Sequence, residues 1–319
     1  MKEVRLIAPS LSLSLKDKAK IVKAEKYFKS LGYTLTIGKY VFQKDNYFGC
    51  SSIENRVADL MDAFLDKNVE IILCANGGYN VNQILPYIDY KKVQQNPKIL
   101  IGYSDITALL IAIMKKTTLT TYYGPMLDGF SSANEYTLKY FEKILEKKDF
   151  FITSSKEIYD YQKINGKIKE VTIKNNGMIP IQEGKAIGKI IGGNLCTLNL
   201  LQGTEYMPDL NNSILFLEDD ADDYGNDVFL LEFDRNLESL LQLSNCNIKG
   251  IVFGRFQLCS NMNLDKLKAL IRNKSKLKDI PIVYGADFGH TNPMFTLPLG
   301  AYCQLEIKKS NITIKIISK

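Results

Sequence analysis

Three side chains that could carry out nucleophilic catalysis stand far apart in this chain of 319 residues. Ser104 lies in Gly-Tyr-Ser-Asp-Ile-Thr after an apolar run, Glu218 ends the run Ile-Leu-Phe-Leu-Glu, and His290 lies in a loop rich in glycine and proline. In a hydrolytic triad the serine attacks a carbonyl, the histidine takes its proton, and the carboxylate fixes the histidine tautomer. Since His290 is the only histidine, the general base has a single candidate.

Both Ser104 and His290 also have a purely structural interpretation. A nucleophile on a tight strand-to-helix turn usually lies in Gly-x-Ser-x-Gly, whereas Ile106 stands here at the last position. Serine is a common N-cap, so Ser104 could merely begin the following helix. A lone histidine is more often a satisfied structural residue than a base. From these segments alone, both interpretations stay open.

A second motif, Asn76-Gly77-Gly78-Tyr79, follows the apolar run Val69–Ala75. Two glycines allow a sharp turn that presents bare N–H groups, which together with the N–H of Asp105 could stabilise an oxyanion. The alternative is a plain turn. The glycine loop and Ser104 are both expected at the carboxyl ends of parallel strands, where open α/β sheets bind their ligands.

The pattern of elements predicts an α/β protein of two domains. In the first 150 residues, short apolar runs alternate with helical periodicity, which favours a parallel sheet covered on both faces. Residues 151–183 contain Asn-Gly pairs and many polar residues, and are expected to form a linker or lid with one or two short hairpins. Short strands dominate residues 184–319, which predicts a smaller, mixed α/β domain that carries the acid and the base.

Composition narrows the choice of partner and compartment. The net charge is +6, but the densest basic stretch, residues 272–278, lacks aromatic residues and is expected to be a solvated face, with no nucleic-acid partner. No apolar stretch has the length of a membrane span, and the N-terminus does not resemble a signal peptide. The six cysteines lack Cys-x-x-Cys spacing and are expected to be buried free thiols. We therefore expect a cytoplasmic protein without a membrane partner.

Taken in order, several segments resemble the serine peptidases that include bacterial LD-carboxypeptidases and the microcin C immunity proteins, with the first run closer to the microcin-immunity branch. The matching segments are Asn76–Asn80, Leu85–Tyr90, Asn96–Thr107, Gly192–Leu195, Gly203-Thr204, Phe216–Asp219, Gly254–Phe256 and Gly289–Thr291.

This resemblance implies roles for several residues. It implies a serine nucleophile at Ser104, an acid at Glu218, a base at His290, and an oxyanion hole formed by the backbone of Gly78 and Asp105. Substrate contacts are expected at Gly77, Tyr79 and Asn80. The resemblance also implies a flavodoxin-like N-terminal domain, a smaller C-terminal domain, a cleft between them and a homodimer, without a metal or cofactor.

Two substrates remain open for such a hydrolase. One is a peptidyl- or aminoacyl-nucleotide of the microcin C type, cleaved for self-protection, and the other is a muropeptide, cleaved during cell-wall recycling. The microcin-immunity relatives are expected to clamp the nucleobase with aromatic side chains, including a tryptophan, and this chain has none. Tyr159 or Tyr161 could take its place. The rival from another class is a non-catalytic protein that binds a small ligand.

Overall fold

The computed structural model describes residues 2–221 and 228–317, which form two compact units. Unit 1 comprises Met1–Phe141, Leu200–Pro208 and Thr296–Gly300, and unit 2 comprises Glu142–Asn199, Asp209–Phe295 and Ala301–Lys319. The segment 151–183 therefore belongs to unit 2, so the two units are of similar length. Two short returns of the chain, residues 200–208 and 296–300, complete unit 1.

Unit 1 is built on a six-stranded sheet with the order β14-β5-β4-β3-β1-β2. Strands β1 to β5 are parallel, and β14 joins the edge antiparallel to β5. The order β2-β1-β3-β4-β5 is that of the flavodoxin-like sheets, so the predicted fold class is confirmed. The strands are β1 (Glu3–Ile7), β2 (Thr34–Ile37), β3 (Val69–Cys74), β4 (Ile99–Gly102), β5 (Thr121–Tyr123) and β14 (Leu297–Leu299).

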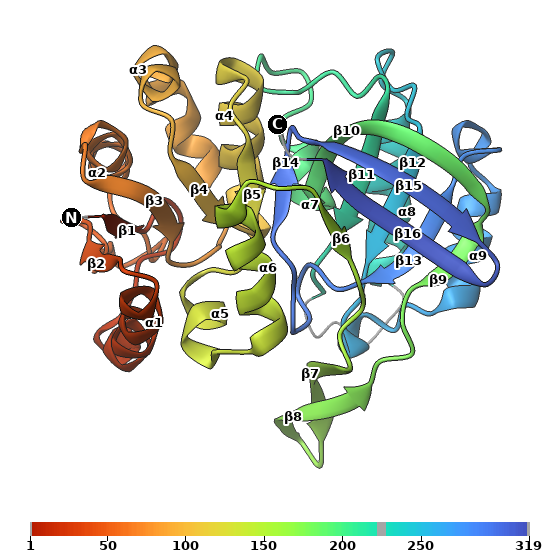
Figure 1. The fold of residues 1–319 in the computed structure, drawn as a ribbon, viewed down its shortest axis with the longest axis horizontal. Helices are drawn as coiled ribbons and strands as arrows, with labels where there is room; N and C mark the ends of the chain where they lie inside the picture. Colours follow the sequence, from red (N-terminus) through yellow and green to blue (C-terminus); the bar gives the residue numbers. More distant parts are fainter. Residues whose placement is uncertain (1, 222–227, 318–319) are drawn as a thin grey trace. The chain divides into compact units, whose positions relative to one another are not determined.

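Helices cover both faces of this sheet, which explains why its central strands are continuously apolar. Figure 1 shows α2, α3 and α4 on one side and α1 and α5 on the other. The helices are α1 (Lys18–Ser30), α2 (Ile53–Leu65), α3 (Tyr90–Gln95), α4 (Thr107–Thr117), α5 (Leu127–Ser132) and α6 (Glu135–Glu146), with short 3-10 helices at Leu15–Asp17, Val81–Tyr87 and Ser104–Ile106.

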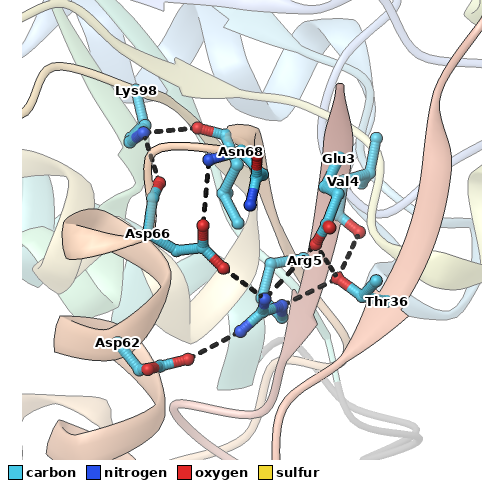
Figure 2. A network of polar contacts seen from close by, with 9 residues as sticks. Glu3, Val4, Arg5, Thr36, Asp62, Asp66, Asn68 and Lys98 are labelled. Carbon is cyan, nitrogen blue, oxygen red and sulfur yellow. Dashed lines mark hydrogen bonds and ion pairs between the residues drawn. The ribbon is translucent and has the colours of Figure 1, made fainter. Parts of the chain in front are cut away.

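A network of charges joins β1 to the end of α2 in unit 1 (Figure 2). The Arg5 guanidinium donates to Asp62 at 2.6 Å, to Asp66 at 2.9 Å and to Glu3 at 3.3 Å, and its Nε donates to the Thr36 hydroxyl at 2.7 Å. The Arg5 side chain, which is 13% exposed, therefore contacts all four of the other residues. We call these five residues the Arg5 network.

Unit 2 contains a mixed eight-stranded sheet with the order β6-β16-β15-β10-β11-β12-β13-β9. Its centre, β10 to β13, is parallel, and the flanking strands are antiparallel. The strands are β6 (Phe150–Ile152), β9 (Ile179–Gln182), β10 (Gly184–Asn194), β11 (Ser213–Glu218), β12 (Gly250–Gly254), β13 (Ile282–Ala286), β15 (Tyr302–Lys308) and β16 (Asn311–Ile317). The helices are α7 (Leu195–Asn199), α8 (Val228–Leu241) and α9 (Leu264–Arg272), with 3-10 helices at Leu258–Ser260 and Ser275–Leu277.

The segment expected to hold one or two hairpins contains one, formed by β7 (Glu157–Ile164) and β8 (Lys167–Lys174). Its turn is Asn165-Gly166, and both residues have positive φ, as a tight hairpin turn requires. Figure 1 shows this hairpin projecting away from the eight-stranded sheet of its own unit.

Two expectations from composition can be compared with the described residues. All six cysteines are free thiols, but Cys196 on α7 is exposed and Cys259 is partly exposed, so the expectation of buried thiols is wrong for these two positions. Cys196 has apolar neighbours in the sequence, but it lies on the side of α7 that faces solvent. Across residues 2–221 and 228–317, none of the helices combines the length and the apolar composition that a membrane crossing needs.

Candidate active site

Ser104 occupies the turn between β4 and α4, and its backbone conformation is unusual. Its φ is 61°, in the left-handed region that costs free energy for a residue with a Cβ. Such strain concentrates at functional positions, because the surrounding structure must hold it in place. Here the Ser104 N–H donates to the Tyr123 hydroxyl at 3.2 Å. Ser104 therefore adopts a strained strand-to-helix turn, although Ile106 stands where the Gly-x-Ser-x-Gly pattern has its second glycine.

The Asp105 carboxylate ties three loops together at the carboxyl ends of the strands. Its Oδ2 accepts from the Ser10 hydroxyl at 2.5 Å and from the N–H groups of Asn80 and Val81 at 3.0 Å each. Ser10 follows β1, Asn80 follows β3, and Asp105 itself follows β4. The carboxylate is buried, with Asp105 only 3% exposed. It therefore fixes the loops around Ser104 through neutral donors alone.

The glycines after β3 are required by close approach. A Cβ on Gly77 would lie 3.0 Å from the Ser104 Cβ and 3.2 Å from its hydroxyl. Gly78 has a φ of 149°, and a Cβ there would lie 2.5 Å from the Ser10 hydroxyl. The site of the Gly77 Cβ is also 3.7 Å from the Asp105 nitrogen. The glycine loop therefore lies directly against the serine and the start of its helix.

The two remaining predicted substrate contacts differ in their surroundings. Tyr79 is 76% exposed, so its ring is accessible. The Asn80 side chain instead donates to the Phe48 carbonyl at 3.4 Å and to the Cys50 sulfur at 3.5 Å, and the Asn80 carbonyl accepts from Arg56 at 2.9 Å. Asn80 thus makes several contacts that hold the loop.

In unit 2 the structure brings Glu218 and His290 together. Glu218 is the last residue of β11, and His290 lies in the loop after β13. The His290 Nδ1 and Glu218 Oε2 are 2.7 Å apart, and the Glu218 side chain is fully buried. A Cβ on Gly289 would lie 2.5 Å from the same Oε2, so glycine is needed for the loop to approach the carboxylate. Nδ1 is therefore the ring nitrogen of His290 that faces the Glu218 carboxylate.

This pairing sets the protonation of the histidine. Burial of the imidazole acts to lower its pKa, but the carboxylates of Glu218, Asp220 and Asp219 together outweigh burial and raise the pKa from 6.5 to about 9, with Glu218 as the main contributor among them. Burial also raises the pKa of Asp219 well above its ordinary value, and the neighbouring carboxylates of Glu218 and Asp220 add to the effect. Three carboxyl groups, those of Glu218, Asp219 and Asp220, therefore gather near one imidazole at the end of β11.

Asn194 at the end of β10 binds this acidic group. Its Nδ2 donates to Asp219 at 2.9 Å and to Asp220 at 3.0 Å, while its Oδ1 accepts from the Thr197 N–H at 2.9 Å and caps α7. In the parallel register Asn194 lies beside Glu218. Asn194 therefore both caps α7 and holds the two aspartates.

Several residues of the site escaped the sequence analysis. Ser10 and Tyr123 contact Asp105 and Ser104, and the buried Arg56 binds the carbonyls of Pro9 and Asn80. A signal existed for Ser10, because it follows the first strand and must lie at the same sheet edge as the other loops. The contact made by Tyr123 depends on the pairing of β4 with β5, which the sequence pattern does not give.

Two family models match this chain. The model of the LD-carboxypeptidase N-terminal domain matches residues 4–124, and that of the C-terminal domain matches residues 187–305. The chain belongs to the LD-carboxypeptidase family. It is thereby a member of a family of serine peptidases, and the resemblance inferred from the sequence segments is confirmed.

Individual members of the family show the breadth of the match. A Bacillus subtilis (strain 168) protein named "Putative carboxypeptidase YocD" is 44% identical over 95% of this chain and 93% of its own length. The Microcin C7 self-immunity protein MccF of Escherichia coli is 30% identical over 98% of this chain and 92% of its own. The crystal structure of an MccF-like protein from Bacillus anthracis str. Ames is 41% identical, has a TM-score of 0.93, and covers 100% of this chain and 97% of its own.

Proposed function

We propose that this serine peptidase cleaves an amide bond in a small peptide-like substrate, with Ser104 as nucleophile, His290 as general base and Glu218 as the residue that orients His290. The observation that carries the proposal is the Glu218–His290 pair. The only histidine of the chain is held 2.7 Å from a fully buried carboxylate, as a general base requires. The strained φ of Ser104 supports its role as the nucleophile.

The chemistry follows from these groups. The Ser104 hydroxyl attacks the substrate carbonyl while its proton passes to Nε2 of His290, and the Glu218 carboxylate stabilises the imidazolium. The N–H groups of Gly78 and Asp105 donate to the oxyanion of the tetrahedral intermediate. His290 then gives the proton to the leaving amine, and a water molecule activated in the same way releases the acyl group from Ser104.

For the substrate we propose an aminoacyl- or peptidyl-nucleotide of the microcin C type. MccF is named for self-immunity to microcin C7, and it is 30% identical to this chain. Tyr159 and Tyr161 on β7 are proposed to take the place of the tryptophan that the chain lacks. The Tyr161 side chain is 52% exposed, and the Tyr159 backbone pairs with Asn292, two residues beyond His290.

A muropeptide is the second candidate, and the family assignment favours it. Both matching models describe LD-carboxypeptidases, and the protein that is 44% identical carries a carboxypeptidase name. The absence of tryptophan points in the same direction. Either substrate is compatible with the expected location in the cytoplasm and with the expected homodimer. Size-exclusion chromatography with light scattering would test whether the protein is a dimer.

One experiment separates these possibilities. The protein is incubated with an aminoacyl-sulfamoyl-adenosine and, separately, with an L,D-linked muropeptide tetrapeptide, and the products are identified by mass spectrometry. The Ser104→Ala variant is expected to lose several orders of magnitude in turnover on the accepted substrate. Cleavage of the first substrate alone supports the nucleotide proposal, and cleavage of the second alone supports the carboxypeptidase. Full activity of Ser104→Ala would exclude the mechanism.

A further inference from the structure

The loop that carries His290 is closed at its base by Asp287. The Phe295 N–H donates to the Asp287 carbonyl at 2.8 Å, which closes the loop 287–295 at its base. The Asp287 side chain is 1% exposed and forms an ion pair with Arg255, whose Nε lies 2.7 Å from Oδ1. Arg255 directly follows β12, so the loop is anchored to the central sheet of unit 2.

Both ends of the β7–β8 hairpin meet the same carboxylate. The Ser155 N–H donates to Asp287 Oδ2 at 2.6 Å, and the Asn175 Nδ2 donates to Oδ1 at 3.1 Å. Arg255 Nη2 also donates to the Asn175 Oδ1 at 2.7 Å. Ser155 precedes β7 and Asn175 follows β8, so one buried ion pair holds the two ends of the hairpin.

A third connection lies beyond His290 itself. The Tyr159 N–H donates to the Asn292 carbonyl at 2.6 Å, and the Asn292 N–H donates to the Tyr159 carbonyl at 3.0 Å. The Asp160 carboxylate, on the same strand, accepts from the Leu258 N–H at 2.6 Å. The hairpin is therefore joined to the His290 loop on both sides of the histidine.

We propose that Arg255, Asn175 and Asp287 are positioning residues that hold the His290 loop and the β7–β8 hairpin as one body. This inference rests on the proposed function, because it assigns these residues to the placement of the general base. Movement of the hairpin then moves the imidazole relative to Glu218. A buried ion pair that merely stabilised unit 2 would have no such effect.

The single histidine makes the inference directly measurable. His290 gives the only histidine imidazole signal in an NMR spectrum of the whole protein, so its pKa can be followed by titration without substrate. Among the described residues, the carboxylates that raise this pKa are Glu218, Asp220 and Asp219. If the loop loses its anchor, the contact with Glu218 lengthens and the pKa of His290 falls.

Two variants separate position from charge. Arg255→Gln removes a cation, and this direct electrostatic effect alone would raise the pKa of His290. Loss of positioning predicts the opposite, a fall of about 0.5 unit or more. Asn175→Ala changes no charge and breaks the link between hairpin and Asp287, so it should also lower the pKa. A rise or no change in both variants would overturn the inference.

Kinetics with the accepted substrate provide the second readout. A misplaced base should lower kcat by about 10- to 100-fold while KM changes by less than about threefold. Asp66→Ala in the Arg5 network is the matched control, since it also removes a contact between an arginine and an aspartate, here 2.9 Å long. It should lower Tm without moving the pKa of His290 or kcat.

The two proposals can fail separately. If the wild-type protein cleaves neither substrate, the proposed function fails, and the NMR titration still decides whether these residues position His290. If the wild type is active, Ser104→Ala is inactive, and both variants keep the wild-type pKa and kcat, the positioning role alone is excluded.

Discussion

The Arg5 network and the Glu218–His290 pair are both built on short ionic contacts around a largely buried base, Arg5 at 13% and His290 at 16% exposed, but their acids differ in burial. Arg5 lies 2.6 Å from Asp62 and 2.9 Å from Asp66, whose side chains are 69% and 27% exposed. Glu218 lies 2.7 Å from His290, and these side chains are 0% and 16% exposed. Nearly equal distances therefore occur in very different dielectric surroundings.

They also differ in how their charge responds to pH. A guanidinium stays protonated throughout the range in which proteins are folded, whereas an imidazole gains or loses its charge near neutrality. Exposed ion pairs contribute little stability because water screens them, and a buried pair strongly alters the pKa of its partners. The comparison teaches that distance alone does not identify a functional pair, since burial and a titratable partner are also needed.

Removal of the Glu218 charge should have the largest effect on activity. Glu218→Gln keeps the shape but no longer stabilises the imidazolium, and in triads such a change costs roughly 10⁴-fold in kcat. The pKa of His290 should fall from about 9, because the carboxylate that raises it is gone. Steady-state kinetics and NMR titration measure the two effects. A variant with wild-type kcat would mean that Glu218 is no more functional than the acids around Arg5.

Asp105 tests a buried carboxylate whose hydrogen bonds come from neutral donors. Its carboxylate is buried and accepts three hydrogen bonds, all from neutral donors. Asp105→Ala leaves these donors unsatisfied and should cost about 2–3 kcal/mol of stability and about 100-fold in kcat. Asp105→Asn keeps an acceptor oxygen and should lie closer to the wild type. Urea unfolding and kinetics check the order, and equal losses in both variants would show that charge matters more than acceptor geometry.

The pH dependence should show activity and stability changing in opposite directions. The pKa of His290 in the folded protein, about 9, lies above its ordinary value of 6.5. The stabilisation by the charged imidazole is therefore fully present below about pH 6.5 and is lost as the pH rises through about 9. The neutral imidazole that acts as the base increases over the same range, so kcat/KM should rise by about tenfold per unit before it levels off.

The measurement is kcat/KM and Tm from about pH 6 to about pH 10, with His290→Ala as the control for Tm. In the wild type, Tm should fall as the pH rises and His290 loses its charge. In the His290→Ala variant this part of the fall in Tm should be absent. A kcat/KM that decreases across this interval would contradict the assignment of His290 as the base.

The sheet of unit 1 could be predicted from the sequence because the patterns that mark its strands are local. Continuous apolar runs such as Val69–Cys74 are buried on both faces, and the motifs after them must lie at one sheet edge. Ser104, Gly77, Gly78 and Asp105 were therefore predicted together, and the structure brings them together within unit 1. The pairing of Glu218 with His290 was predicted from their residue types, and the structure places them in contact within unit 2.

Contacts that depend on long-range pairing could not be predicted in the same way. The three-residue strand Leu297–Leu299 joins β5 although Leu297 and its partner Tyr123 are 174 residues apart in the sequence. No local periodicity marks so short a strand. The contacts of Asp287 with Arg255, Ser155 and Asn175 likewise join four segments, and the polar residues involved resemble ordinary loop residues in the sequence.

Substitution of Arg5 should have the smallest effect and should touch stability alone. Arg5→Ala removes contacts to acids that are partly exposed, so the free energy of unfolding should fall by about 1 kcal/mol, less at high salt because ions screen the pairs. The pKa of Asp66, lowered by the Asn68 N–H and then by Arg5, should rise in the variant. Urea unfolding at low and high salt measures the loss, and kcat should stay at the wild-type value. A fall in kcat would show that this network, whose acids are partly exposed, also supports the loops around Ser104, and the distinction drawn from the burial of the acids would then not hold.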